Sequence, residues 1–139
     1  MPGCNYQYYS RNYAAKALSE KGVPIAMGCD IGGGQHAAVY RQVARAVQLS
    51  KLKEFYEPEG NGSITFAQAF HMATKAGGSV FDRAGSLEKG YRFNALVLDG
   101  LEDEGFTLSP EERAERFCYA GDDRNIIGRF IDGKEIILP

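Results

Sequence analysis

A single carboxylate between an apolar run and a glycine run is the feature of this sequence best suited to chemistry. Asp30 follows the apolar segment 23–27 and precedes three consecutive glycines at 32–34. The apolar segment suits a buried strand, and the glycines permit backbone dihedrals that other residues avoid. At the carboxyl end of a strand in an α/β barrel, a carboxylate is typical of catalysis or metal binding. The alternative interpretation is that Asp30 only caps the following helix, a position that Asp favours.

Three other residues and one charged cluster have side chains suited to catalysis or ligand binding. Cys29 is a candidate nucleophile or soft metal ligand, although cysteine is more often a buried and inert residue. His36 follows the glycine run and is a candidate for the mouth of a pocket, whereas His71 lies in a helical pattern that favours a packed or surface residue. The Asp-Asp-Arg cluster at 122–124 favours a local ion pair or a helix-end network over a catalytic role.

The elements that position these residues alternate between helix and strand in the first part of the chain. An alanine-rich stretch predicts a helix over 13–21 that Gly22 terminates. The strand over 23–27 follows almost directly. The glycine run then leads into a long helix over 35–57, in which apolar residues recur on one broad face.

Two later helices carry start signals of their own. Thr65 and the glutamine three residues later form a capping-box pattern, and the glycines at 77 and 78 end that helix. Ser109, followed by a proline at the first helical position and a glutamate at the third, begins the other helix. This second helix ends near Gly121, where the pattern stops.

The remaining segments have the character of strands and turns. Apolar residues predict a strand within 91–99, and an Asp-Gly turn predicts a hairpin over 129–136. The change from helical to strand-like segments places a boundary near residues 79–84. We therefore expect one α/β part over 1–80 and a β-rich part with one helix over 81–139.

Composition excludes several classes of partner. The formal net charge is −2, which gives no electrostatic reason to expect nucleic acid. No apolar run approaches the roughly 20 residues that span a bilayer, so no membrane partner is expected. The three cysteines are an odd number at unrelated spacings, which argues against a disulfide framework and for a cytoplasmic location.

Five segments carry a resemblance to the amidohydrolase superfamily. Residues 28–34 resemble its Gly-Thr/Ser-Asp-Ile/Val-Ala/Gly-Gly segment, with Cys29 in place of the usual hydroxyl residue. Residues 64–78 resemble the helix after the barrel. Residues 85–90 and 95–99 resemble the C-terminal strand pair, and Asn94 stands where an Asp is common. Residues 115–126 are similar to the guanine-deaminating members in particular.

The resemblance implies a fold and a chemistry. It implies the C-terminal part of a TIM-barrel metallohydrolase, namely the last strand with its helices, plus part of a small β-sandwich domain. It assigns Asp30 two roles, metal ligand and proton acceptor, in a zinc-dependent deamination of guanine to xanthine and ammonia. It also implies a homodimer for the full-length relative. Because Asn94 replaces an Asp that is common in the family, we expect that a structural hydrogen bond is lost at this position.

The family's His-x-His pair is missing from this sequence, which contains only His36 and His71. The sequence therefore predicts a C-terminal fragment that binds no catalytic zinc by itself and is inactive alone, because catalytic zinc needs about three protein ligands. Three alternatives stay open: another amidohydrolase deaminase or chlorohydrolase-like activity, a non-catalytic assembly module, and an unrelated enzyme with Cys29 as nucleophile.

Overall fold

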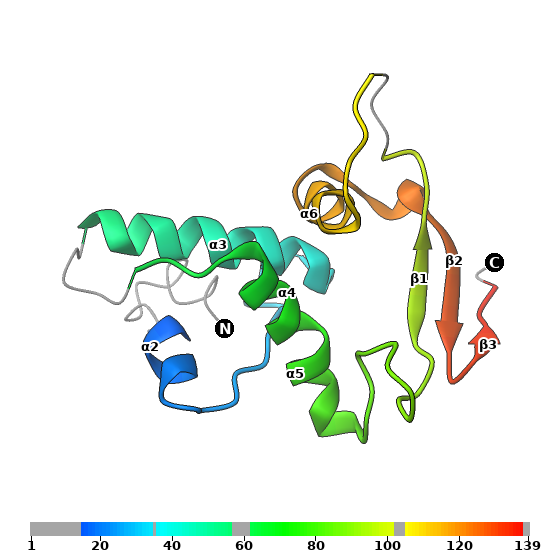
Figure 1. Cartoon of the computed structure of the whole chain (residues 1–139), viewed down its shortest axis with the longest axis horizontal. Coiled ribbons are helices and arrows are strands. Elements are labelled where there is room, and N and C mark those ends of the chain that lie inside the picture. Colours follow the sequence, from blue (N-terminus) through cyan, green and yellow to red (C-terminus); the bar gives the residue numbers. More distant parts are fainter. Residues whose placement is uncertain (1–14, 35, 57–61, 102–104, 138–139) are drawn as a thin grey trace.

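The computed structural model describes residues 15–34, 36–56, 62–101 and 105–137, and shows helices beside a small sheet (Figure 1). The longer helices are α3, α4 and α6, and the sheet contains β1, β2 and β3. In chain order the elements are α2 (Ala15–Glu20), α3 (Val39–Tyr56), α4 (Phe66–Ala73), α5 (Lys75–Gly78), η1 (Ser79–Phe81), β1 (Ala95–Leu98), α6 (Pro110–Ala120), η2 (Asp123–Asn125), β2 (Ile126–Ile131) and β3 (Lys134–Glu135).

The predicted capping box at Thr65 and the predicted helix start at Ser109 are confirmed. The Thr65 hydroxyl accepts the N–H of Gln68 at 3.2 Å, and the Gln68 side chain accepts the N–H of Thr65 at 2.9 Å. Ser109 and Glu112 form the same reciprocal pair at the start of α6, with Pro110 in the first turn. These caps satisfy N–H groups that have no partner inside a helix, so the sequence fixes where α4 and α6 begin.

The helix that begins at Phe66 ends earlier than predicted. α4 stops at Ala73, because Thr74 has φ −113° and ψ −92°, and a separate short helix follows. The Thr74 hydroxyl donates a hydrogen bond to the Phe70 carbonyl at 2.7 Å. Such side-chain bonds to the preceding turn compete with the helical ladder, and they place the break before the glycines.

The sheet is antiparallel with the strand order β1-β2-β3. The hairpin between β2 and β3 is confirmed, and it turns at Asp132 and Gly133, which have φ 52° and 76°. Two positive φ values in succession are the geometry for which Asp-Gly is selected. β1 is shorter than the predicted strand, and its pairing with β2 shifts register between Val97 and Leu98.

The predicted strand over 23–27 is wrong. This segment forms no strand in the structure, and Val23 is 42% exposed. Hydrogen bonds tie it to helices instead: the Val23 N–H donates to the Leu18 carbonyl of α2 at 3.0 Å, and the Met27 N–H donates to the Met72 carbonyl of α4 at 3.0 Å. A strand needs a neighbouring strand to accept its hydrogen bonds, and none of the described strands lies against this segment.

The other boundaries agree with the predictions to within a few residues. α2 begins at Ala15, and Gly22 follows it with φ 73°, as expected for a residue that ends a helix. α3 begins at Val39, later than the predicted 35, and residues 35 and 57 lie outside the described part. None of the helices in the described ranges is long and apolar enough to cross a membrane.

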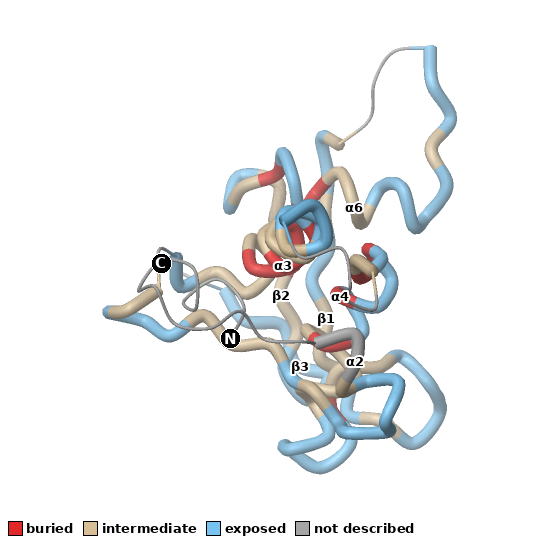
Figure 2. Tube along the Cα trace, turned by 90° about the vertical axis from the view of Figure 1, so that its left-hand side faces the viewer, coloured by how far each residue is buried: buried red, intermediate tan, exposed pale blue. Residues whose placement is uncertain are grey.

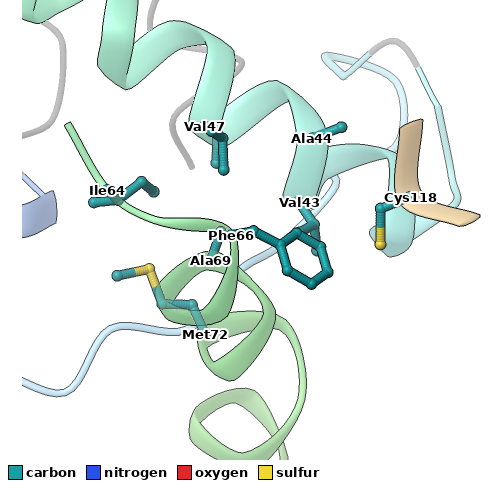
Figure 3. Close-up of a cluster of buried hydrophobic side chains, with 9 residues drawn as sticks. Val43, Ala44, Val47, Ile64, Phe66, Ala69, Met72 and Cys118 are labelled. Carbon is teal, nitrogen blue, oxygen red and sulfur yellow. The ribbon is translucent and has the colours of Figure 1, made fainter. Parts of the chain in front are cut away.

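The core lies where α3, α4 and α6 meet, and Figure 2 shows buried segments gathered there. Val43 and Ala69 are almost completely buried, and Cys118 of α6 belongs to the same cluster (Figure 3). The rings of Tyr40 and Phe117 stack with centroids 4.4 Å apart. One apolar cluster thus joins helices from both sides of the predicted boundary at 79–84, while the division into two domains stays a prediction.

Candidate functional site

Asp30 lies in a tight turn that glycine makes possible. Its carbonyl accepts hydrogen bonds from the N–H of Gly33 at 3.0 Å and from the N–H of Gly34. Asp30 itself has φ 52°, in the left-handed region. A Cβ on Gly34 would lie 1.7 Å from the Cys29 carbonyl oxygen, so no other residue fits there without a change of backbone. The turn presents the exposed Asp30 side chain at the surface of the described structure.

The segment before Asp30 is anchored to the core although it is not a strand. Ile25 and Met27 pack against the core cluster, and the Met27 N–H bonds to Met72 of α4. Met27 is thus held both by packing and by a hydrogen bond, and Asp30 lies three positions after it in the chain. Apolar anchoring followed by a glycine turn is an arrangement that can position one acidic side chain reproducibly.

The other predicted site residues do not join Asp30 in a metal site. Cys29 is half-buried, and His36 and His71 are exposed. Within the described ranges, no group of three or more His, Cys, Asp or Glu side chains is placed to hold a metal ion. A catalytic zinc site needs about three protein ligands, so the described residues do not fit a complete one.

The charged cluster at 122–124 forms the predicted local ion pair. The Arg124 guanidinium donates to both carboxylate oxygens of Asp122, with the shortest distance 2.6 Å, and Asp122 also accepts the Arg124 N–H at 2.9 Å. These hydrogen bonds lower the pKa of Asp122 from 3.8 to about 2. The cluster caps η2, which is a structural role.

The titration of Asp122 tests this ion pair. We expect a carbon-detected NMR titration to give Asp122 a pKa of about 2, and Arg124→Gln to move it toward 3.8. Because the folded-state pKa lies below the unfolded value, the pair favours folding above about pH 4 and loses that contribution as pH falls through 2. Asp132 is the internal control, since its pKa is lowered by Arg92 and not by Arg124. A wild-type Asp122 pKa near 3.8 would contradict the ion pair.

The structure also corrects the expectation at Asn94. Its side-chain oxygen accepts the Asp132 N–H at 2.8 Å, so this residue makes a structural hydrogen bond. Arg92 holds the side chain of the same Asp132 through two hydrogen bonds. Sequence reasoning missed this connection because about forty residues separate the partners, and no local pattern signals it.

A second feature that the sequence did not signal is an apolar cavity of about 680 Å³ between the helices and the sheet. Aromatic side chains from three helices and from β2 form much of its wall, and β1 borders it. The lining includes Tyr40, Phe70, Phe117, Cys118, Leu96, Leu98 and Phe130. Burial raises the pKa of the Cys118 thiol to about 11, so this cysteine stays protonated and unreactive at neutral pH.

Comparison with known protein families identifies the family of this chain. The Amidohydrolase family matches residues 10–136, which is nearly the whole chain. The chain belongs to this family.

Relatives of this chain within the family include guanine deaminases. It is 28% identical to the guanine deaminase of Dictyostelium discoideum, over 97% of this chain and 32% of that protein. The structure of guanine deaminase from C. acetobutylicum, with guanine bound in its active site, aligns with a TM-score of 0.88 and 38% identity over 98% of this chain and 32% of that one. E. coli guanine deaminase shares the fold, with a TM-score of 0.79. The chain thus spans about a third of the length of these relatives.

Proposed function

We propose that this chain supplies about a third of a guanine deaminase, an enzyme that converts guanine and water into xanthine and ammonia. The observation that carries the proposal is the likeness to the guanine-bound C. acetobutylicum enzyme, at 38% identity over 98% of this chain. The similarity to the Dictyostelium discoideum enzyme along almost the full chain supports the same activity.

Asp30 is the residue that we assign to the reaction. In hydrolytic deamination, water adds to the ring carbon that bears the exocyclic amine, the bond from this carbon to the amine nitrogen breaks, and ammonia leaves. A carboxylate that accepts the proton of the attacking water lowers the barrier to the first step. The exposed position of Asp30 on an anchored glycine turn supports this role.

Asp30 is the one residue of this chain to which we assign a role as zinc ligand. The described residues do not fit a complete site, so we place the remaining ligands in polypeptide that the relatives carry beyond the matched third.

The finer architecture belongs to the same proposal. Within a complete enzyme, residues 1–80 would contribute helices and the anchored segment 23–27 to a TIM barrel, and residues 81–139 would contribute part of a β-sandwich domain. The TM-score of 0.88 with a guanine deaminase supports this assignment. A homodimer of the complete protein and a cytoplasmic location stay predictions.

A hybrid enzyme tests the proposal. We expect that replacing the matched third of the C. acetobutylicum enzyme by this chain gives a hybrid that converts guanine to xanthine, measured by ultraviolet absorbance. The purified chain alone is expected to show no turnover with zinc added. A folded hybrid that is inactive on guanine but active on another purine or a triazine would favour another amidohydrolase activity.

A further inference from the structure

The sequence contains two Asp-Gly pairs, and the structure holds them in different ways. The pair Asp99-Gly100 follows β1, and the pair Asp132-Gly133 forms the turn between β2 and β3. Figure 1 shows these two places at opposite ends of the sheet. Both aspartates are exposed. An aspartate before glycine can react with its own backbone, because glycine has no side chain that blocks the approach to its nitrogen.

In the first pair the glycine nitrogen lies against the aspartate carboxylate. The Gly100 N–H donates a hydrogen bond to Oδ1 of Asp99 at 2.7 Å. Cγ of Asp99 is one bond away from that oxygen, so a nucleophilic nitrogen and an electrophilic carbon are neighbours in the folded chain. Gly100 has φ 69°, a conformation that glycine adopts without strain. Two reacting groups that folding already holds together lose less entropy when they combine, which lowers the barrier to their reaction.

Asn125 of η2 holds the peptide group that joins this pair. Its Nδ2 donates to the Asp99 carbonyl at 2.9 Å, and the Asp99 N–H donates to the Asn125 carbonyl at 2.9 Å. The backbone on both sides of the Asp99 carboxylate is therefore fixed. A donor on the Asp99 carbonyl also stabilises the negative charge that this peptide group carries when the Gly100 nitrogen loses its proton. Asn125 thus positions the nitrogen and makes it a better nucleophile.

In the second pair both reacting groups are held by other residues. The Arg92 guanidinium donates two hydrogen bonds to the Asp132 carboxylate, and these bonds lower the pKa of Asp132. The carboxyl must be protonated for one of its oxygens to leave as water, and the lowered pKa makes that form rarer. The Gly133 N–H donates to the Phe93 carbonyl at 2.9 Å, so its nitrogen faces a neighbouring strand segment.

We propose that Asp99-Gly100 is a site of spontaneous modification, where the aspartate converts to isoaspartate through a succinimide. The Gly100 nitrogen bonds to Cγ of the protonated carboxyl, and one carboxyl oxygen leaves as water with the carboxyl proton and the N–H proton. Water then adds to the backbone carbonyl carbon of Asp99, and the bond from this carbon to the Gly100 nitrogen breaks. One water is released and one is consumed, so neither mass nor oxidation state changes.

The modification alters the end of β1. The main chain then runs through Cγ of Asp99 and is longer by one methylene group, while the carbonyl that Asn125 holds becomes a free α-carboxylate. Such a carboxylate is the methyl acceptor of isoaspartyl carboxyl methyltransferases, which use S-adenosylmethionine, and we infer this class of enzyme as a partner of the aged chain. The proposal rests on the backbone around Asp99 and is independent of guanine deamination.

Ageing of the full chain, folded and at neutral pH, tests the proposal. After several weeks at physiological temperature the protein is digested with trypsin, which separates the two pairs into the peptides 93–113 and 130–134. Electron-transfer fragmentation identifies isoaspartate in each peptide without a change in mass. We expect isoaspartate to accumulate about tenfold faster at Asp99 than at Asp132, because only the first pair holds its nitrogen against its carboxylate.

Two controls separate the effect of the fold from that of the local sequence. In concentrated urea the two rates are expected to agree within about twofold, because the contacts that distinguish the pairs are lost. Arg92→Gln releases the Asp132 carboxylate and is expected to speed isoaspartate formation there about threefold, while the rate at Asp99 in the same molecule stays unchanged. Equal rates at the two pairs in the folded chain, or a tenfold difference that persists in urea, would overturn the proposal.

Discussion

In the hybrid enzyme, Asp30→Asn is expected to lower kcat for guanine by about 10³-fold while KM changes little. Removing a positioned proton acceptor affects the transition state and typically costs 10² to 10⁴ in rate, whereas ground-state binding of guanine is retained. Steady-state kinetics by absorbance, with xanthine and ammonia quantified separately, measure both parameters. The large effect follows from the turn, which holds this carboxylate at one place through Gly33 and Gly34.

Two variants control this experiment. Asp123→Asn removes an exposed carboxylate elsewhere on the chain and is expected to leave kcat within about twofold, as surface changes away from special features usually do. Asp30→Glu keeps the charge and shifts the carboxylate along a longer side chain, so it is expected to retain part of the activity. An Asp30→Asn hybrid that keeps full turnover with an unchanged melting temperature would remove Asp30 from the reaction.

The elements that local chemistry determines were predictable from the sequence. The capping boxes at Thr65 and Ser109 involve residues three positions apart, and the turn at Asp132 depends on two adjacent residues. In each of these cases the partner lies within the same short segment. A pattern within a few residues is therefore enough to identify the structure.

The strand over 23–27 could not be settled in the same way. An apolar run shows that a segment is suited to burial, but strand formation also needs a neighbouring strand, and that neighbour is set by the rest of the fold. In the structure Ile25 and Met27 pack on the core, as the apolar run predicts. The segment does not pair with a strand, so the predicted backbone structure is wrong. The break at Thr74 differs from the predicted helix end, because Gly77 and Gly78 are the residues that favour the end of a helix by sequence alone.

Of the candidate site, the sequence indicates Asp30, whose role stays a prediction. Its type and its glycine neighbours are local, whereas the cavity collects residues from α3 to β2 and has no sequence pattern. The two features meet at α4. The Met72 carbonyl accepts the hydrogen bond that anchors the segment before Asp30, and Phe70 and Ala73 of the same helix line the cavity.

The second large effect concerns the core that supports this helix. Phe117→Ala is expected to lower the free energy of unfolding by about 3 kcal/mol, the lower end of the range for Phe→Ala, because one side of the ring already borders the cavity. Phe117 is 4% exposed, stacks on Tyr40 and lies against Gly121, where an added Cβ would approach its ring to 2.4 Å. Urea unfolding followed by circular dichroism measures the change.

Phe106→Ala is the matched control, because Phe106 is 74% exposed and lies in the loop before α6. Its removal is expected to change the free energy of unfolding by less than about 0.5 kcal/mol. Equal effects from the two substitutions would mean that α6 is not packed on α3 through Phe117. The loss at Phe117 should also spread beyond α6, since Tyr40 belongs to α3 and α3 packs on α4. Amide exchange in α4 is accordingly expected to accelerate in Phe117→Ala and to stay unchanged in Phe106→Ala.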